Sequence, residues 1–117
     1  MKLEALIAYL ASRTQIRGKK ALQKLVYFCR EAGVPLYATY RLHVYGPYSN
    51  EVAEELRTAV DKEIVAIDQD GFTFFAGSAC QLCLNEYRRD IGLYRDEIER
   101  VLACFGPCSP VELELYA

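Results

Sequence analysis

The stretch of sequence that decides the fold is residues 64–75, which read Ile64-Val65-Ala66-Ile67-Asp68-Gln69-Asp70-Gly71-Phe72-Thr73-Phe74-Phe75. Two runs of β-branched and aromatic residues flank a four-residue segment that ends in Asp70-Gly71, and Asp-Gly is a strong turn signal between such runs. We therefore predict an antiparallel hairpin over residues 64–75. A hairpin that follows several helices is typical of a winged-helix domain.

The residues before this hairpin predict three helices and a strand. The first helix is amphipathic, with apolar residues three and four positions apart at Leu3, Leu6, Ile7 and Leu10. The second follows Gly18, and its apolar positions are Leu22, Leu25, Val26 and Cys29. The third is capped by Ser49, and its apolar positions are Val52, Ala53, Leu56, Ala59 and Val60. Residues 40–45 alternate in polarity and predict a strand that joins the sheet of the hairpin.

The residues after the hairpin predict further helices. A long helix runs to about Phe105, because apolar residues step by three or four positions from Leu84 onward. Ser109-Pro110 then opens a short last helix over Val111–Tyr116. The predicted class is therefore α+β: one winged-helix-like domain over residues 1–117, with three helices, a small antiparallel sheet and additional C-terminal helices. Helices added in this way either cover the sheet or form a homodimer, so the long helix is a candidate dimer surface.

Length and composition restrict the classes of protein further. The chain has 117 residues, of which 52% are hydrophobic, so it can build one core but not two. No apolar run approaches the ~18 residues of a membrane span, and no membrane association is predicted. The five cysteines are scattered, which suits a reducing compartment better than a disulfide framework. We expect a cytoplasmic protein.

The charges are divided unevenly along the chain. Residues 1–45 carry eight basic and two acidic residues, whereas residues 46–117 carry six basic and fourteen acidic ones. Either the two parts face each other in one fold, or the basic part binds nucleic acid or an acidic partner. The basic residues that could contact phosphates are Arg13, Arg17, Lys19 and Lys20. The third helix and the hairpin turn are acidic, so direct reading of DNA by that helix is not favoured.

Two neighbouring motifs supply a candidate protein-binding patch. On the second helix, the apolar positions leave Lys24 and Tyr27 on the outer side, with Gln23 at the edge. The second motif is the turn Tyr45-Gly46-Pro47-Tyr48, which precedes the third helix. Exposed aromatic residues beside a lysine suit a protein interface. The alternative is structural, since glycine and proline serve turn geometry and the aromatic residues could be covered by other elements.

The same two motifs resemble a known family. A Leu22-Gln23-Lys24-Leu25 helix that continues to Tyr27-Phe28, followed by Tyr45-Gly46-Pro47, resembles the Panacea domain of SocA-like antitoxins. The form Tyr-Gly-Pro-Tyr-Ser is similar to the YwgA-like branch. The resemblance covers residues 16–65 and implies an antitoxin domain that neutralises a toxin, or an adaptor that presents a partner to proteolysis.

Residues that could support catalysis or hold a metal do not form a recognisable pattern. Cys80, Cys83, Cys104 and Cys108 have the spacing of a four-thiolate zinc site, but one continuous helix over residues 79–105 would separate Cys83 from Cys104 by ~32 Å. His43 is the only histidine, so no triad is suggested. We predict no enzyme activity, no cofactor and no metal. The predicted function is a non-catalytic protein-interaction module, antitoxin- or adaptor-like by resemblance, and the alternative is a DNA-binding transcriptional regulator.

Overall fold

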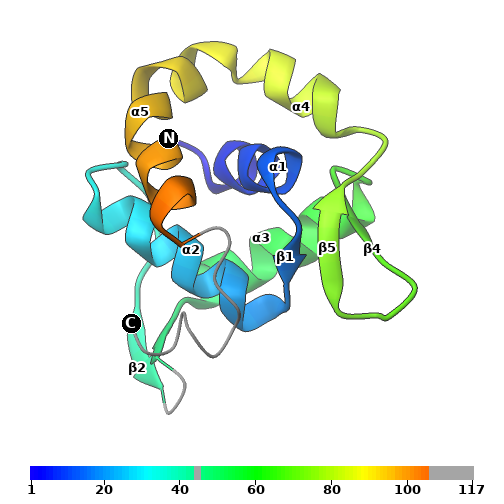
Figure 1. The fold of residues 1–117 in the computed structure, drawn as a ribbon, viewed down its shortest axis with the longest axis horizontal. Coiled ribbons are helices and arrows are strands. Elements are labelled where there is room, and N and C mark those ends of the chain that lie inside the picture. Colours follow the sequence, from blue (N-terminus) through cyan, green and yellow to red (C-terminus); the bar gives the residue numbers. More distant parts are fainter. Residues whose placement is uncertain (44–45, 106–117) are drawn as a thin grey trace.

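Five helices and five short strands make up residues 1–43 and 46–105, the part of the chain that the computed structural model describes. In chain order they are α1 (Leu3–Arg13), β1 (Ile16–Arg17), α2 (Lys19–Glu31), β2 (Arg41–His43), β3 (Gly46–Tyr48), α3 (Asn50–Asp61), β4 (Val65–Ile67), β5 (Thr73–Ala76), α4 (Cys80–Glu86) and α5 (Arg88–Phe105). Figure 1 shows α1 near the middle, with α4 and α5 arching around it and the β4–β5 hairpin at one side. The α+β class is confirmed, and no helix within these residues is long and apolar enough to cross a bilayer.

The hairpin predicted over residues 64–75 is confirmed. Strand β4 pairs with β5 in antiparallel register, with Ile67 opposite Phe74. The Asp70 carboxylate holds the turn, because it accepts hydrogen bonds from the backbone N–H groups of Phe72 and Thr73, at 2.8 and 2.9 Å. These N–H donors also lower the pKa of Asp70. The acidic turn residue is therefore part of the turn structure.

The prediction that residues 40–45 join this sheet is wrong. The third strand is β1, which pairs with β5 through Ile16 and Arg17, so that the strand order is β1-β5-β4. Strand β2 pairs instead with β3 in a separate two-stranded sheet, with Arg41 opposite Tyr48. Gly46 has a φ of 110°, a conformation that a residue with a side chain rarely adopts.

Helix α1 forms the centre of the core. All seven residues from Ala5 to Ala11 are buried, including those that the sequence pattern placed on a polar face. The first helix is thus confirmed, but its apolar surface is wider than predicted. The reason is that α1 packs against elements on several sides: α3, α4, α5 and β5.

The single long helix predicted after the hairpin is in fact two helices. Helix α4 ends at Glu86 and α5 begins at Arg88, and the intervening Tyr87 has a φ of −104° and a ψ of 22°, outside the helical range. The Tyr87 hydroxyl donates a hydrogen bond of 2.9 Å to Glu4 of α1. The break allows α4 and α5 to bend around α1 (Figure 1). The short last helix predicted over Val111–Tyr116 lies outside the described residues.

Candidate functional site

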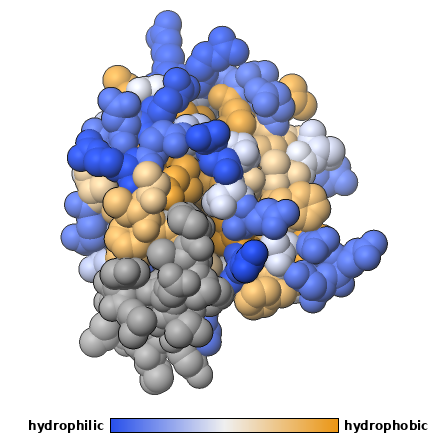
Figure 2. All heavy atoms as spheres, in the orientation of Figure 1, coloured by the Kyte–Doolittle hydropathy of each residue, from blue (hydrophilic) through white to orange (hydrophobic). Residues whose placement is uncertain are grey.

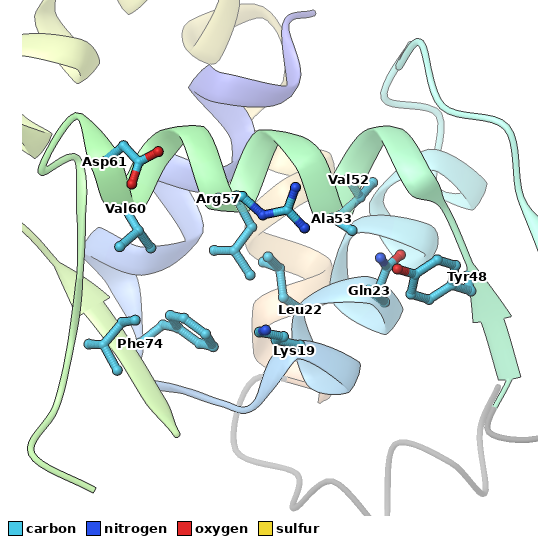
Figure 3. Close-up of a pocket in the computed structure, with 12 residues that line it drawn as sticks. Lys19, Leu22, Gln23, Tyr48, Val52, Ala53, Arg57, Val60, Asp61 and Phe74 are labelled. Carbon is cyan, nitrogen blue, oxygen red and sulfur yellow. The ribbon is translucent and has the colours of Figure 1, made fainter. Parts of the chain in front are cut away.

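A groove lies between α2, α3 and the hairpin. It encloses a cavity of about 220 Å³, which is lined by Lys19, Leu22, Gln23, Tyr48, Val52, Ala53, Leu56, Arg57, Val60, Asp61, Ile67 and Phe74. Figure 3 shows Phe74 at one end, Gln23 and Tyr48 at the other, and the Arg57 side chain extending from α3 between them. The floor of this groove is mainly aliphatic and aromatic, and the charged side chains lie at its edges.

A second cavity of about 170 Å³ adjoins the first at the start of α2. Its described lining is Lys19, Lys20, Gln23, Lys24, Gly46, Pro47 and Tyr48. Three of these residues, Lys19, Gln23 and Tyr48, line both cavities, so the two lie next to each other. We call the first part the apolar cavity and the second part the lysine cavity.

Gln23 fixes α2 against the start of α3. Its Nε2 donates to the Ser49 carbonyl oxygen at 2.8 Å, and the Ser49 N–H donates to its Oε1 at 2.9 Å. Ser49 in turn caps α3 as predicted, because its Oγ accepts a hydrogen bond from the N–H of Val52. The two helices that form the walls of the groove are therefore held together by paired hydrogen bonds between buried groups.

The turn of the hairpin is packed against the start of α2. Gly18 precedes α2 with a φ of 105°, and a Cβ placed on it would come within 2.7 Å of the Phe72 ring. Only glycine satisfies both the backbone conformation and the close approach. This contact brings the hairpin and α2 together as two sides of the apolar cavity.

The structure separates the residues of the predicted protein-binding patch. Lys24 is 1% exposed, so the prediction that it lies on the outer side of the helix is wrong, and Gln23, predicted at the edge of the apolar stripe, is also buried at 5% exposure. They are covered because β3 and α3 pack on the side of α2 that the sequence pattern left to solvent. Gly46 and Pro47 are half-buried and line the lysine cavity. Tyr45 lies outside the described residues.

Tyr27 lies apart from the described lining of both cavities, within an aromatic cluster. Its ring makes edge contacts with Phe28 and Tyr40, at centroid distances of 5.9 and 5.2 Å. Phe28 stacks on Phe105 of α5 at 4.2 Å. Burial raises the pKa of the Tyr40 hydroxyl. These contacts give Tyr27 a packing role between α2, α5 and the segment before β2.

The predicted basic cluster is divided by the fold. Arg13 pairs with Glu99 of α5, with 2.9 Å between Nε and Oε1. The hydrogen bond from Arg13 lowers the pKa of Glu99, and Tyr9 also donates to this carboxylate. Lys19 and Lys20 are exposed and border the lysine cavity. Arg17 is exposed on β1.

The apolar residues of the groove were read from the sequence as core. Helix α3 presents a wide apolar surface, of which Val52 and Leu56 are buried and Ala53 and Val60 remain half-exposed. Ile67 of β4 is 44% exposed, at the end of the groove near Phe74. Figure 2 shows apolar side chains at the surface on the side where Figure 1 places the hairpin, among hydrophilic ones. One signal in the sequence could have predicted the groove. The apolar surface of α3 is wider than a single face packed on the core requires.

Three of the four cysteines that the structure describes are buried as packing residues. Cys29, Cys80 and Cys83 are buried, and Cys104 is exposed. Burial raises the pKa of Cys29 to about 12 and that of Cys83 to about 11. The separation expected for Cys83 and Cys104 assumed one continuous helix, and the break at Tyr87 shows that this assumption is wrong. Even so, α4 and the end of α5 lie on different sides of α1 (Figure 1). Within residues 1–43 and 46–105, no three potential metal ligands form a cluster.

The chain is similar to a curated protein over part of its length. The chain is 40% identical over 42 residues to the uncharacterized protein YwgA of Bacillus subtilis (strain 168). The match covers 36% of this chain and 25% of YwgA, so the chain matches about a quarter of the length of this relative. No family model matches the chain. The comparison supports a YwgA-like relationship over this stretch.

Proposed function

We propose that this domain is a non-catalytic protein-interaction module, antitoxin- or adaptor-like, in which a segment of a partner protein lies in the groove between α2, α3 and the hairpin. The observation that carries the proposal is that the apolar and lysine cavities are neighbours, with Lys19, Gln23 and Tyr48 in the lining of both. An apolar floor with charged residues at the edge is the usual composition of a protein interface.

The size of the cavities supports a peptide-like occupant. At about 220 and 170 Å³, each is smaller than the ~300–1,000 Å³ of a typical small-molecule site. Cavities of this size can each receive a single side chain of a partner segment. The paired hydrogen bonds between Gln23 and Ser49 keep the walls in place before binding, which reduces the ordering cost of association.

The proposal includes the winged-helix class for the fold. Its support is the order of elements, in which β1 lies between α1 and α2, α3 follows, and the hairpin comes next. In the three-stranded sheet, β5 lies in the middle and pairs with β1 on one side and with β4, the other strand of the hairpin, on the other side. In this class α3 corresponds to the helix that reads DNA in DNA-binding members.

The charges on α3 favour a protein over DNA as the partner. Glu51, Glu54 and Asp61 are exposed on this helix, and Asp68 and Asp70 are exposed at the hairpin turn. Phosphates would be repelled by both elements. Within the predicted basic cluster, Arg17, Lys19 and Lys20 are the residues left to compensate, since Arg13 is paired with Glu99.

The test is a selection of random twelve-residue peptides on the immobilised domain. We expect peptides whose binding is lost in Ala53→Trp, because this half-exposed residue lines the apolar cavity and the indole would fill it. The matched control is Ala103→Trp, an exposed alanine of α5, which should retain binding. Circular dichroism of each variant verifies its fold.

A labelled DNA duplex, titrated at low and moderate salt, forms the opposing arm of this test. Salt-sensitive duplex binding that is lost in Lys19→Gln/Lys20→Gln, with no groove-dependent peptide recovered, would contradict the proposal in favour of the DNA-binding regulator.

A further inference from the structure

We infer that two copies of this domain associate through the outer face of α5, in an antiparallel pair of helices related by a two-fold axis between Gly92 and Leu93. The inference is independent of the groove, whose described lining contains no residue of α5. Three properties of this helix face support it: an exposed leucine, a glycine that the domain itself does not require, and charges of both signs that are spaced for reciprocal pairing.

The outer face of α5 is the side of the helix that is turned away from the core. The buried residues of α5, such as Ile91 and Ile98, lie on the opposite side, where the helix packs against α1 and α2. Figure 1 shows α5 at the edge of the molecule, where it curves around α1. Residues three or four positions apart share one helix face. On the outer face, the exposed residues at this spacing are Arg89, Gly92, Leu93, Asp96, Arg100 and Ala103.

Leu93 and Gly92 form the centre of the outer face. The Leu93 side chain is 71% exposed. Gly92 lies within the helix without a positive φ, and a Cβ placed on it would meet none of the described residues within 4 Å. Glycine inside a helix is less favourable than alanine, and nothing in the described part of the domain accounts for it. A second helix on this face accounts for both residues, because the missing Cβ lets the two helix axes approach and Leu93 is then covered.

The charges on either side of this centre are self-complementary. Arg89 and Asp96 are exposed and lie about 10.5 Å apart along the helix axis, and neither makes an ion pair with another of the described residues. A two-fold axis between Gly92 and Leu93 places Arg89 of one copy opposite Asp96 of the other, and the symmetry forms this pair twice. Leu93 then lies against Leu93 of the second copy at the axis.

Other arrangements of the same two helices are less favourable. A parallel pair in register would bring Arg89 against Arg89 and Asp96 against Asp96, and like charges repel. An antiparallel pair centred on Asp96 would bring the two Asp96 carboxylates together. An antiparallel pair that joins Asp96 to Arg100 would leave Arg89 without an acid opposite to it and would move Leu93 away from the axis. The arrangement centred on Gly92 and Leu93 pairs both charges and covers both leucines.

The size of this face determines the expected strength of association. Stable, specific interfaces bury about 1,200–2,000 Å² in total, and one helix face from each copy provides less than that. We therefore expect a weak dimer, populated at micromolar and higher concentrations, with the two grooves remaining open.

The experiment is sedimentation velocity over about a hundredfold range of protein concentration, in which the wild type should shift from monomer to dimer. Arg89→Asp places like charges opposite each other twice and should weaken association at least tenfold, and Asp96→Arg should do the same. An equimolar mixture of these two variants should restore the dimer, because every pair in the mixed dimer again joins opposite charges. The control is Arg100→Asp, the same change on the same face, which should associate like the wild type.

Gly92→Ala separates association from folding. It should weaken the dimer several-fold, whereas the helix of the monomer becomes more favourable, as circular dichroism at low concentration would show. A wild type that stays monomeric over the whole range, or a mixture that associates no better than its components, would overturn the inference. A dimer that Arg100→Asp dissociates and Arg89→Asp does not would also overturn it. These results leave the proposed function of the groove standing, since peptide selection tests that function separately.

Discussion

Gln23 uses both ends of its side-chain amide on the backbone of one residue, Ser49. The amide donates to the Ser49 carbonyl and accepts from the Ser49 N–H, at 2.8 and 2.9 Å, and both residues are buried. The two residues are 26 positions apart in the chain, so this pair closes the loop that contains β2 and β3. This pair therefore adds hydrogen bonds between α2 and the start of α3 to the apolar packing of the two helices.

We predict that Gln23→Leu lowers the free energy of unfolding by about 1–3 kcal/mol, the cost of one buried donor left without a partner. That donor is the Ser49 N–H, whereas the Ser49 carbonyl still accepts a hydrogen bond from the Ala53 N–H of α3. Chemical denaturation measures the change. Gln15→Leu is the control, because Gln15 is exposed and a surface substitution of this kind costs less than about 0.5 kcal/mol. Equal effects of the two substitutions would contradict the role given to Gln23.

Two glycines should respond in opposite directions to replacement by alanine. A Cβ on Gly77 would lie 2.1 Å from the carbonyl oxygen of Glu63, a backbone atom that cannot move aside alone. Gly77→Ala should therefore destabilise the protein by about 1–3 kcal/mol or more. Gly92 lies exposed within α5 with no atom near its missing Cβ, so Gly92→Ala should stabilise it by about 0.5–1 kcal/mol. Thermal denaturation of both variants tests the pair.

Glu99 should make the stability depend on acid pH. The hydrogen bond from Arg13 lowers its pKa below the ordinary 4.5, so the unfolded chain takes up a proton at a higher pH than the folded chain does. Stability is then fully present above about pH 4.5 and falls as the pH drops from there through the pKa of the folded state. Glu99→Gln should flatten this part of the curve of unfolding free energy against pH. An unchanged acid limb would contradict the assignment.

Tyr9→Phe tests the same contact from the other side. The Tyr9 hydroxyl donates to Glu99, and its removal should cost about 1.5 kcal/mol at neutral pH. Tyr37→Phe is the matched control, because Tyr37 is 96% exposed and should change stability little. The difference between the two variants in urea denaturation gives the contribution of the Tyr9–Glu99 contact.

Tyr27 and Tyr48 should separate stability from binding. Tyr27→Ala removes two aromatic contacts, each contributing about 0.5–1.5 kcal/mol, and should lower stability by about 1–3 kcal/mol. Tyr48→Ala changes a residue that lines both cavities and should weaken groove-dependent peptides at least tenfold. Calorimetric titration of Tyr48→Ala, at a temperature where it is folded, makes the comparison. Full peptide affinity in that variant would contradict the placement of the site.

The elements that the sequence predicted well are those whose signals are local. The helices α1, α2 and α3 follow from the spacing of apolar residues, and Ser49 marks the start of α3 through its own side chain. The hairpin follows from Asp70-Gly71 between two β-prone runs. In each case, the interactions that form the element are made by residues close to one another in the sequence.

The features that the sequence did not predict depend on distant contacts. Alternation over residues 40–45 predicts a strand, but it does not say which strand will be its partner, and β1 is too short to show any pattern. The apolar spacing through Leu84, Tyr87 and Ile91 continues across the break after α4, so it does not show the break. Tyr87, the residue at the break, donates a hydrogen bond to Glu4, which lies 83 positions away in the chain. No periodicity within one segment can contain that information.

The candidate site was predicted in part, for the same reason. The sequence placed Gly46, Pro47 and Tyr48 beside the second helix, and they line the lysine cavity together with Lys24. It placed the buried Lys24 on an outer face, because helical spacing gives the direction of the apolar stripe but not how many neighbours cover the helix. The apolar cavity needs α3 and the hairpin together, and their approach is decided by tertiary packing.

The central position of α1 has a consequence for biosynthesis. Its apolar surface from Ala5 to Ala11 is covered by α3, β5, α4 and α5, all of which follow it in the chain, and the hydrogen-bond partner of Tyr9 is made 90 positions later. At roughly 5–20 residues per second, the nascent chain carries this helix without its cover for on the order of 5–18 s. During that interval the helix needs shielding by the ribosome surface or a chaperone, and the domain reaches its native packing only when α5 has emerged.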